Sequence, residues 1–324
     1  LHDYLAQNTS TLPVLKNEKE KGSQLGIIRE FVANKYGLVN DDVDIAKLIS
    51  SQEQRRMRRI EEKSSHKQLF DSEGGVVDVE RSSMWLAKGN VSPQQEGMWC
   101  KLQDRNLFFA NRKKCPHCGE RFSVDHIATK CGRLLSFDYK HRHDEIVRCL
   151  HLHFARRFGL TNARKMRGYK VESTVANDRA RICSDTPILT DSRVDCNKPD
   201  LMIHDIKENV ITLVEVGVTN KRILKQTEST KSRKYQHLAN ELRQIYRAKV
   251  VIIPVVFTWD GLVTNFSKRY FEDLGISKQI FAYAQTVVLR YTCQSILVDS
   301  RERSPYDEEA IEVALGRLES ECDR

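Results

Sequence analysis

Three cysteines and one histidine stand at a spacing typical of a zinc site. Cys115 and Cys118 are separated by two residues, His126 follows after seven more, and Cys131 after another four. A tight turn brings the first two sulfurs together, and a short helix presents the histidine and the last cysteine. Zinc prefers sulfur and imidazole ligands, and a site closed by four protein ligands is structural rather than catalytic. The sequence therefore predicts one structural Zn²⁺ ion per chain.

Basic side chains surround this motif. They are Lys113, Lys114, Arg121, Lys130 and Arg133. Cations at this density favour contact with the phosphates of a nucleic acid. The alternative is a small structural zinc site that stabilises the fold and does not contact nucleic acid.

Two carboxylates further along the chain could hold a second metal ion. Asp200 follows Lys198-Pro199, and Glu215 lies in the middle of the apolar run 210–218. If these segments form a hairpin, both carboxylates converge on one end of a sheet. With the backbone carbonyl of Val216 and water, they would make a Mg²⁺ site that activates water and stabilises charge on a phosphate. A turn residue and a surface acid are the plainer interpretation, but the apolar neighbours of Glu215 predict a buried carboxylate that needs a partner.

Nuclease chemistry of this kind also needs a cation near the attacking water. The common arrangement places a lysine two residues after the second acid, where this chain has Gly217. Lys231 and Lys234 follow on a predicted helix, three positions apart, and share one of its faces. Either lysine could replace the missing one. Each could equally be an ordinary surface residue, because the chain has 53 basic residues.

Composition is consistent with a polyanionic partner. The chain has 324 residues, is 40% hydrophobic and 30% charged, and carries a formal net charge of +9. This balance favours a nucleic acid over an acidic protein, with a solvated basic surface as the alternative. No apolar run reaches membrane-spanning length and no signal peptide is visible, so no membrane partner is expected. Of the nine cysteines, three belong to the zinc motif and the other six are irregularly spaced, which indicates reduced intracellular thiols rather than a disulfide framework.

Four regions are expected along the chain. Residues 1–80 form a charged helical region or linker, 81–132 a helical segment with the zinc motif, 133–300 a catalytic domain, and 301–324 an acidic tail. The run Arg55–Arg59 is either a solvated helix or an arm that contacts phosphates. In the second region Met98, Trp99, Leu102 and Leu107 repeat at helical spacing and are expected in a core rather than stacked on bases.

The third region predicts a mixed α/β domain. Helices are expected at 143–158, 227–247, 265–274 and 280–297, and strands at 169–175, 199–203, 210–218 and 250–257, with a polar loop at 176–197. The turn between the second and third strands falls at 205–209. Pro254 inside an otherwise buried strand requires a sheet edge or a bulge. No glycine-rich phosphate loop is present, so the domain is not a doubly wound nucleotide fold.

The ordered set of motifs resembles one protein family. The zinc motif, Arg142-His143-Asp144, Lys198-Pro199-Asp200, a strand acid and Lys231-x-x-Lys234-Tyr235 are similar to the C-terminal region of certain non-LTR retrotransposon polyproteins. These polyproteins carry a restriction-like endonuclease behind a CCHC zinc knuckle. The similarity runs from about Ser82 to Leu274, and also covers Trp85-Leu-Ala-Lys-Gly and Val251–Val256.

The resemblance implies a fold and an activity. The fold would be the PD-(D/E)XK core, preceded by the zinc knuckle and a charged helical region. The reaction would be Mg²⁺- or Mn²⁺-dependent nicking of target DNA, leaving a 3′-hydroxyl that primes reverse transcription. Partners would be target DNA, element RNA and an upstream reverse transcriptase of the same polyprotein, and the location would be nuclear.

The resemblance also implies roles for individual residues. Asp200 and Glu215 would hold the catalytic metal together with the Val216 carbonyl, and an acid of the first helix, Asp144 or Glu145, could complete its shell. The catalytic cation would be the relocated Lys231, with Lys234 and Tyr235 beside it. Arg142 and His143 would contact nucleic acid.

The chain departs from the family pattern in three ways. The strand acid is Glu215 where Asp is frequent, Gly217 replaces the usual lysine, and no Tyr-x-Asp-Asp polymerase signature is present. Two other functions therefore stay open. One is a nucleic-acid-binding module that keeps the nuclease scaffold without catalysis, and the other is a nuclease specific for DNA junctions.

Overall fold

The computed structural model describes residues 24–36, 45–62, 75–104 and 113–301. Leu107 and the predicted tail beyond Arg301 lie outside these residues. The chain divides into two compact units, Leu1–Phe70 and Asp71–Arg324, which are considered separately.

The first unit contains two described helices, α3 (Gln24–Tyr36) and α4 (Ile45–Glu62). They are joined by hydrogen bonds in which Ser51 Oγ donates to the Tyr36 carbonyl at 2.6 Å and Arg55 to the Lys35 carbonyl at 2.5 Å. The arginines of the run Arg55–Arg59 lie on α4 and are exposed. The run is therefore helical and accessible to solvent, which fits both interpretations of it.

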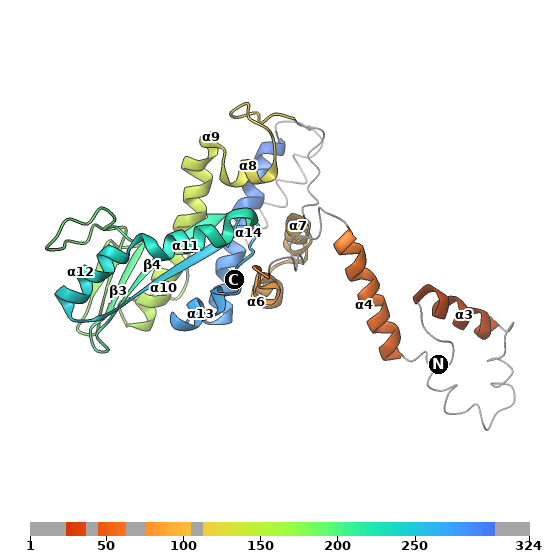
Figure 1. The fold of residues 1–324 in the computed structure, drawn as a ribbon, viewed down its shortest axis with the longest axis horizontal. Helices are drawn as coiled ribbons and strands as arrows, with labels where there is room; N and C mark the ends of the chain where they lie inside the picture. Colours follow the sequence, from red (N-terminus) through yellow and green to blue (C-terminus); the bar gives the residue numbers. More distant parts are fainter. Residues whose placement is uncertain (1–23, 37–44, 63–74, 105–112, 302–324) are drawn as a thin grey trace, which may run out of the picture. The chain divides into compact units, whose positions relative to one another are not determined.

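A five-stranded mixed sheet forms the centre of the second unit (Figure 1). Its strands are β1 (Thr174–Ala176), β2 (Ala180–Ser184), β3 (Leu201–Asp205), β4 (Val210–Thr219) and β5 (Lys249–Thr258), in spatial order β1-β2-β3-β4-β5. The first three pairings are antiparallel, and β4 pairs with β5 in parallel. The fold is thus mixed, with both strand directions, as predicted.

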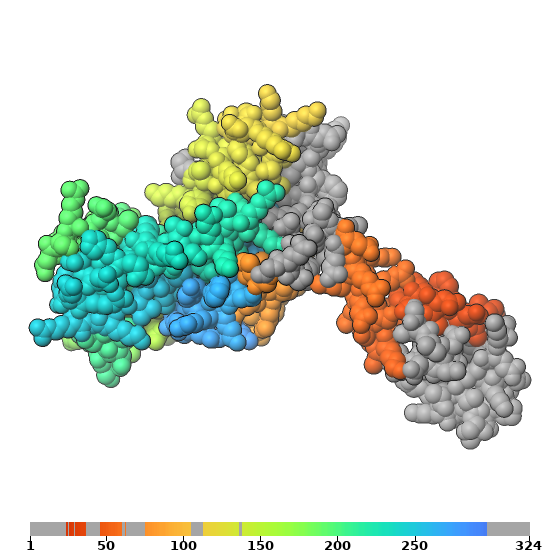
Figure 2. All heavy atoms as spheres, in the orientation of Figure 1, coloured from red at the N-terminus to blue at the C-terminus, as the bar shows by residue number. Residues whose placement is uncertain are grey.

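Helices cover both faces of this sheet. Alternate residues of β4 point to opposite faces. Val214, Val216 and Val218 pack in one core with residues of α10 (Lys140–Arg157) and α14 (Lys278–Arg301), whereas Ile211 and Leu213 pack with α12 (Gln236–Tyr246). Together with α11 (Leu224–Lys234), α12 lies over the face of the sheet that is turned to the viewer in Figure 1, and atoms of these helices cover that part of the molecule in Figure 2.

The predicted hairpin is confirmed. Asp205 pairs with Val210, and Leu201 with Val214, so β3 and β4 are antiparallel neighbours joined by a short turn. Pro254 lies on β5, the last strand of the sheet. An edge strand accommodates proline because one side of its backbone needs no donor.

Three predicted elements differ from the structure. The strand expected at 169–175 is shorter and shifted to 174–176, and β2 lies inside the expected loop. The long helix expected at 227–247 is divided into α11 and α12, because Tyr235 leaves the helical conformation at φ −107° and ψ 19°.

Two short helices pack against α14 and complete the core. They are α6 (Met84–Lys88) and α7 (Pro93–Gln103), and the rings of Trp85 and Trp99 meet edge to face at 5.4 Å. A side chain at Gly89 could not fit, because its Cβ would clash with the backbone carbonyl oxygen of Trp85 and come within 2.8 Å of Thr286 Cγ2. Trp99 and Leu102 are buried, which confirms their predicted place in a core.

Smaller helices surround this core. They are α5 (Val79–Ser82), α8 (Val124–Thr129), α9 (Gly132–Leu134), a π-helical turn at Leu135–Tyr139, a 3-10 turn at Lys221–Ile223, and α13 (Ser267–Asp273). Within the described part of the chain, no helix has both the length and the apolar character that crossing a bilayer requires.

Candidate metal centre and active site

The predicted zinc ligands come together in one cluster. The sulfurs of Cys115, Cys118 and Cys131 and a ring nitrogen of His126 all lie within 4.8 Å of one another. Cys115 and Cys131 are 3.9 Å apart between sulfurs, and Cys118 Sγ lies 3.1 Å from His126 Nε2. A Cys₃His set at these distances is compatible with a structural Zn²⁺ ion.

Local sequence explains how this cluster forms. Lys114 and Arg121 pair as an antiparallel bridge, and the Cys115 N–H donates to the Glu120 carbonyl at 2.7 Å. Gly119 turns the chain with φ +78°, a conformation that favours glycine. Ser123 then caps α8, which carries His126. The turn supplies Cys115 and Cys118, α8 supplies His126, and the residues just after α8 supply Cys131.

The turn, α8 and Cys131, which carry the four ligands, are called the zinc element below. Two hydrogen bonds join this zinc element to the sheet domain. Trp259, next to the end of β5, donates from Nε1 to Asp125 Oδ1 on α8 at 2.7 Å. Arg142 on α10 donates to the Ala128 carbonyl, about one turn further along α8. Both contacts come from elements of the core, so α8 belongs to the same packed unit as the sheet.

The residues predicted to contact nucleic acid fall into different environments. The five cations around the zinc motif are exposed. Arg142 is only 1% exposed, and burial lowers its pKa to about 10. Its guanidinium faces protein and joins α10 to α8, so the structure gives it no surface for a phosphate.

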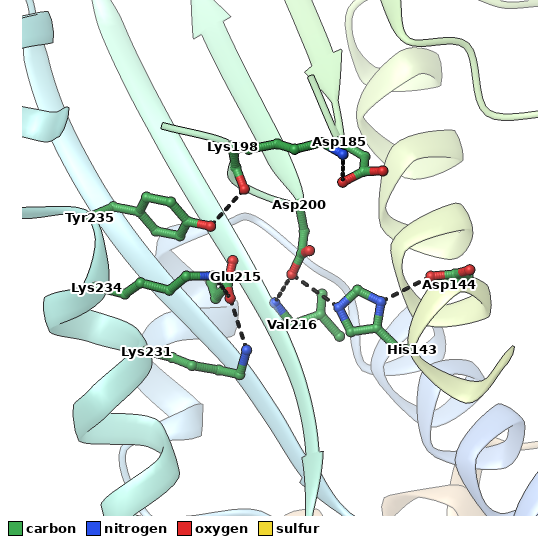
Figure 3. Close-up of polar contacts among 10 residues, drawn as sticks. All are labelled: His143, Asp144, Asp185, Lys198, Asp200, Glu215, Val216, Lys231, Lys234 and Tyr235. Atoms are coloured by element: carbon green, nitrogen blue, oxygen red, sulfur yellow. Dashed lines mark hydrogen bonds and ion pairs between the residues drawn. The ribbon is translucent and has the colours of Figure 1, made fainter. Parts of the chain in front are cut away.

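Asp200 lies immediately before β3 and reaches across to β4 (Figure 3). Its Oδ2 accepts hydrogen bonds from the Val216 N–H at 2.7 Å and from His143 Nε2 at 3.1 Å. Burial favours the neutral carboxyl, but the hydrogen bond and charge of His143 outweigh this effect and lower the pKa of Asp200. The carboxylate is therefore held in its charged form.

His143, on α10, connects Asp200 to that helix. Burial opposes its charged form, yet the hydrogen bond and charge of Asp200 raise the pKa of the imidazole. Its Nδ1 lies 3.1 Å from Asp144 Oδ1. Of the two helix acids, Asp144 is thus linked to Asp200 through His143, whereas Glu145 pairs with Arg148 at 2.6 Å.

Glu215 lies opposite two lysines at the centre of β4. Its Oε1 accepts from Lys231 Nζ at 2.9 Å and from Lys234 Nζ at 2.7 Å, and its side chain is 3% exposed. Its Oε2 is buried and has no hydrogen-bond partner among the described residues. The structure thus brings both predicted lysines to the predicted acid.

Lys231 passes directly over Gly217. A Cβ at position 217 would lie 2.6 Å from Lys231 Cε and 3.0 Å from Cδ. Glycine therefore leaves open the space through which the lysine of α11 reaches Glu215.

Tyr235 holds the segment that carries Asp200. Its side chain is buried, and its hydroxyl donates to the Lys198 carbonyl at 2.7 Å. Lys234 Nζ lies 4.7 Å from the centre of its ring. Because Tyr235 is also the break between α11 and α12, one residue fixes the helix pair against the Lys198-Pro199-Asp200 segment.

The predicted residues Asp200, Glu215, Lys231, Lys234 and Tyr235 lie close to one another, but some of their contacts were not predicted. His143 was expected to contact nucleic acid, and its hydrogen bond to Asp200 went unpredicted. The position of Gly217 as the space for Lys231 was also missed. A glycine between β-branched residues of a buried strand was the available signal, because such a glycine marks close approach of another group.

No model of a known protein family matches this sequence, and no curated protein of similar sequence is found.

Proposed function

We propose that this protein is a divalent-metal-dependent DNA endonuclease with a PD-(D/E)XK core, derived from a non-LTR retrotransposon. One observation supports this proposal more strongly than any other. Lys231 crosses the space over Gly217 and bonds Glu215 at 2.9 Å, which puts an ammonium group beside the strand acid. A nuclease whose usual lysine is replaced by glycine needs a cation from elsewhere at this place.

The topology around the site supports the proposal. Helix α10 is followed by four antiparallel strands, β1 to β4, then by α11 and α12, and finally by β5 in parallel with β4. This order agrees with the core that the resemblance implies. Asp200 and Glu215 lie opposite each other across the β3–β4 pair, since Leu201 pairs with Val214. Asp200 bonds to His143 of α10, and Glu215 bonds to the lysines of α11.

The donor set fits a hard divalent cation. Asp200, Glu215 and the carbonyl of Val216 would supply oxygen ligands of the kind that Mg²⁺ and Mn²⁺ prefer. The Val216 N–H points to Asp200. The carbonyl of Val216 points to the same side of β4, because the N–H and C=O of one strand residue face the same neighbouring strand. The buried, unpartnered Oε2 of Glu215 is the oxygen that such an ion would satisfy.

Once bound, Mg²⁺ or Mn²⁺ would lower the pKa of a water and neutralise charge on the phosphate. The protein's own groups would orient and balance this chemistry. Lys231 would donate to the attacking water or the phosphate oxygen, and Lys234 would hold the buried Glu215 side chain in place through its bond to Oε1. His143 would hold Asp200 in place, and Tyr235 would fix the backbone before it.

The zinc element and the positive charge support the retroelement assignment. Exposed lysines and arginines surround the Cys₃His cluster, and the cluster is fastened to the same core as the acids. Target DNA and element RNA are the proposed partners, beside an upstream reverse transcriptase in the nucleus. The product would be a nick with a 3′-hydroxyl that primes reverse transcription.

A plasmid nicking assay tests the proposal. Supercoiled DNA is incubated with Mg²⁺ or Mn²⁺ and with wild type, Asp200→Asn, Glu215→Gln or Lys231→Ala. Asp191→Asn, in an exposed loop, is the matched control. We expect wild type and the control to produce open-circular DNA, and the three site variants to lose this activity.

Other outcomes point to the other functions. Equal nicking by all proteins rejects the assigned site. Salt-sensitive binding with no cleavage in either metal indicates a module without catalysis. Faster cutting of a four-way junction than of linear duplex indicates a junction nuclease.

A further inference from the structure

A large cationic cavity lies on the side of α10 that faces away from the proposed active site. Its volume is about 1180 Å³, and it is lined by α10, α14, the segment around Gly89 and the segment 164–167. Small-molecule pockets usually measure roughly 300–1,000 Å³. The size of this cavity favours part of a polymer over a metabolite.

The cavity and the acidic site use opposite faces of α10. His143, Val147, Leu150 and Phe154 repeat along the face toward the sheet, where His143 meets Asp200. Arg148 follows His143 by five residues, about 140° around the helix at 3.6 residues per turn. The cavity is therefore a separate site, and nothing in the nuclease proposal uses it.

Positive charge converges on the cavity from three segments of the chain. None of the described residues that line it is an Asp or a Glu. The cations are three residues of α10, three of the loop that follows it, and one of α14: Arg148, Arg156, Arg157, Arg164, Lys165, Arg167 and Arg290. Arg148 is balanced by Glu145 just outside the lining, and the concentration of like charge in one concavity attracts a polyanion.

Aromatic and polar groups line the same wall. Tyr283 and Tyr291, on α14, are half-buried and border the cavity. His153 lines it too, and its Nε2 is buried without a hydrogen-bond partner in the described part of the chain. A buried nitrogen of this kind is expected to meet a ligand or water.

We propose that this cavity binds a single-stranded segment of nucleic acid. Grooves for single strands combine cations along the backbone with aromatic rings on which the bases stack. The bases of a duplex are stacked inside it and could not reach Tyr283 or Tyr291 in a concavity. The inference does not depend on the nuclease activity, since a chain without catalysis would keep the same cavity.

Binding of fluorescein-labelled oligonucleotides to the full chain tests this inference. Anisotropy is measured over a series of salt concentrations, without added divalent metal, for single-stranded DNA, single-stranded RNA and the matching DNA duplex. The variant is Arg156→Gln/Lys165→Gln, in which both side chains are exposed. The matched control is Lys207→Gln/Lys249→Gln, which removes the same charge at the hairpin turn and the start of β5, outside the lining of the cavity.

The expected result is a loss of single-strand affinity in the cavity variant alone. The slope of log affinity against log salt should fall by about 1.4, since each lost phosphate contact contributes about 0.7 for single strands. The DNA and RNA arms show which strand is preferred. Equal affinity and slope in variant and control would overturn the proposal, and so would an equal loss for the duplex.

Photochemical cross-linking gives a second readout that does not depend on the variants. A single strand carrying 5-iodouracil is irradiated with the wild-type protein, and the modified peptides are identified by mass spectrometry. Cross-links to Tyr283 or Tyr291 are expected. Cross-links confined to the zinc element or to α4 would place the single strand elsewhere and contradict the assignment.

Discussion

Lys231 and Gly217 form a matched pair, although they lie on different elements. The glycine on β4 has no side chain, and the lysine on α11 fills the space that a side chain would occupy, with its Cε 2.6 Å from the ideal Cβ position. The ammonium group ends 2.9 Å from Glu215 Oε1. A side chain two residues after Glu215 and a side chain from α11 therefore compete for one volume.

Moving the lysine back to the strand tests this relationship. We expect Lys231→Ala to abolish nicking, and Gly217→Lys/Lys231→Ala to recover part of it, because the new side chain enters the space that the old one leaves. Gly217→Lys alone should be less stable than wild type by roughly 1–3 kcal/mol, since two long side chains then share one volume. Plasmid nicking and urea unfolding measure the two effects.

The control for this exchange is Gly217→Ala/Lys231→Ala, which opens the same space without restoring an ammonium group. It should stay inactive. If the lysine exchange recovers no more activity than this control, Lys231 does not act as the relocated catalytic cation.

Loss of the zinc element should weaken the sheet domain as well. Cys131→Ser removes one of four ligands, so purified protein should contain much less than one zinc per chain. The midpoint of thermal unfolding should fall, because α8 is bonded to Trp259 and Arg142 of the core. Metal analysis and calorimetry measure these changes.

Cys196→Ser is the matched control, because Cys196 is an exposed cysteine outside the cluster. It should keep both zinc and thermal stability. A Cys131→Ser protein that retained a full equivalent of zinc would show that the cluster does not bind the metal in the predicted way.

Arg142 and Arg133 should respond in opposite ways to mutation. Arg142→Met keeps the volume of a buried side chain but leaves the Ala128 carbonyl without its donor, which costs about 1–3 kcal/mol. Arg133→Ala, at an exposed site, should change stability by less than about 0.5 kcal/mol. Only Arg133→Ala is expected to weaken nucleic-acid binding while the fold is intact.

Chemical denaturation and anisotropy, performed on both variants, separate these effects. If Arg142→Met lowers the affinity for nucleic acid at a temperature where the protein is fully folded, Arg142 contacts nucleic acid as the sequence predicted.

Periodicity and ligand spacing predicted the parts of this fold that local chemistry determines. The zinc cluster depends on residue types within 17 positions of one another, and the hairpin at 205–209 on two largely apolar runs around a polar turn. The strand β2 was missed because its sequence, Ala-Arg-Ile-Cys-Ser, alternates only weakly. Its pairing with β1 and β3 provides the hydrogen bonds that local propensity does not indicate.

Long-range side-chain contacts were beyond sequence reasoning for a similar reason. Tyr235 divides a segment whose apolar spacing predicts one helix, and its buried hydroxyl bonds the Lys198 carbonyl 37 residues away. Arg142 resembles a surface cation in sequence, and only the packing of α10 against α8 buries it. In both cases tertiary contact overrides the local pattern.

Stability should depend on pH through Glu228 of α11. This carboxylate is 5% exposed and accepts hydrogen bonds from Thr264 Oγ1 at 2.8 and 2.9 Å. Burial raises its pKa more than the bond from Thr264 lowers it. The folded state therefore keeps the proton that the unfolded chain releases. The free energy of unfolding decreases as the pH rises from the unfolded pKa, about 4.3, through the folded pKa.

Glu228→Gln removes this titration while its amide oxygen still accepts from Thr264. We expect the variant to be more stable than wild type at pH 8, and the difference to shrink as pH falls toward 4.5. Free energies of unfolding from urea titrations between pH 4.5 and 8 measure it. Glu272→Gln, on an exposed face of α13, is the control and should show no such trend. A stability difference that grew as the pH was lowered would mean that the ionised carboxylate of Glu228 stabilises the fold.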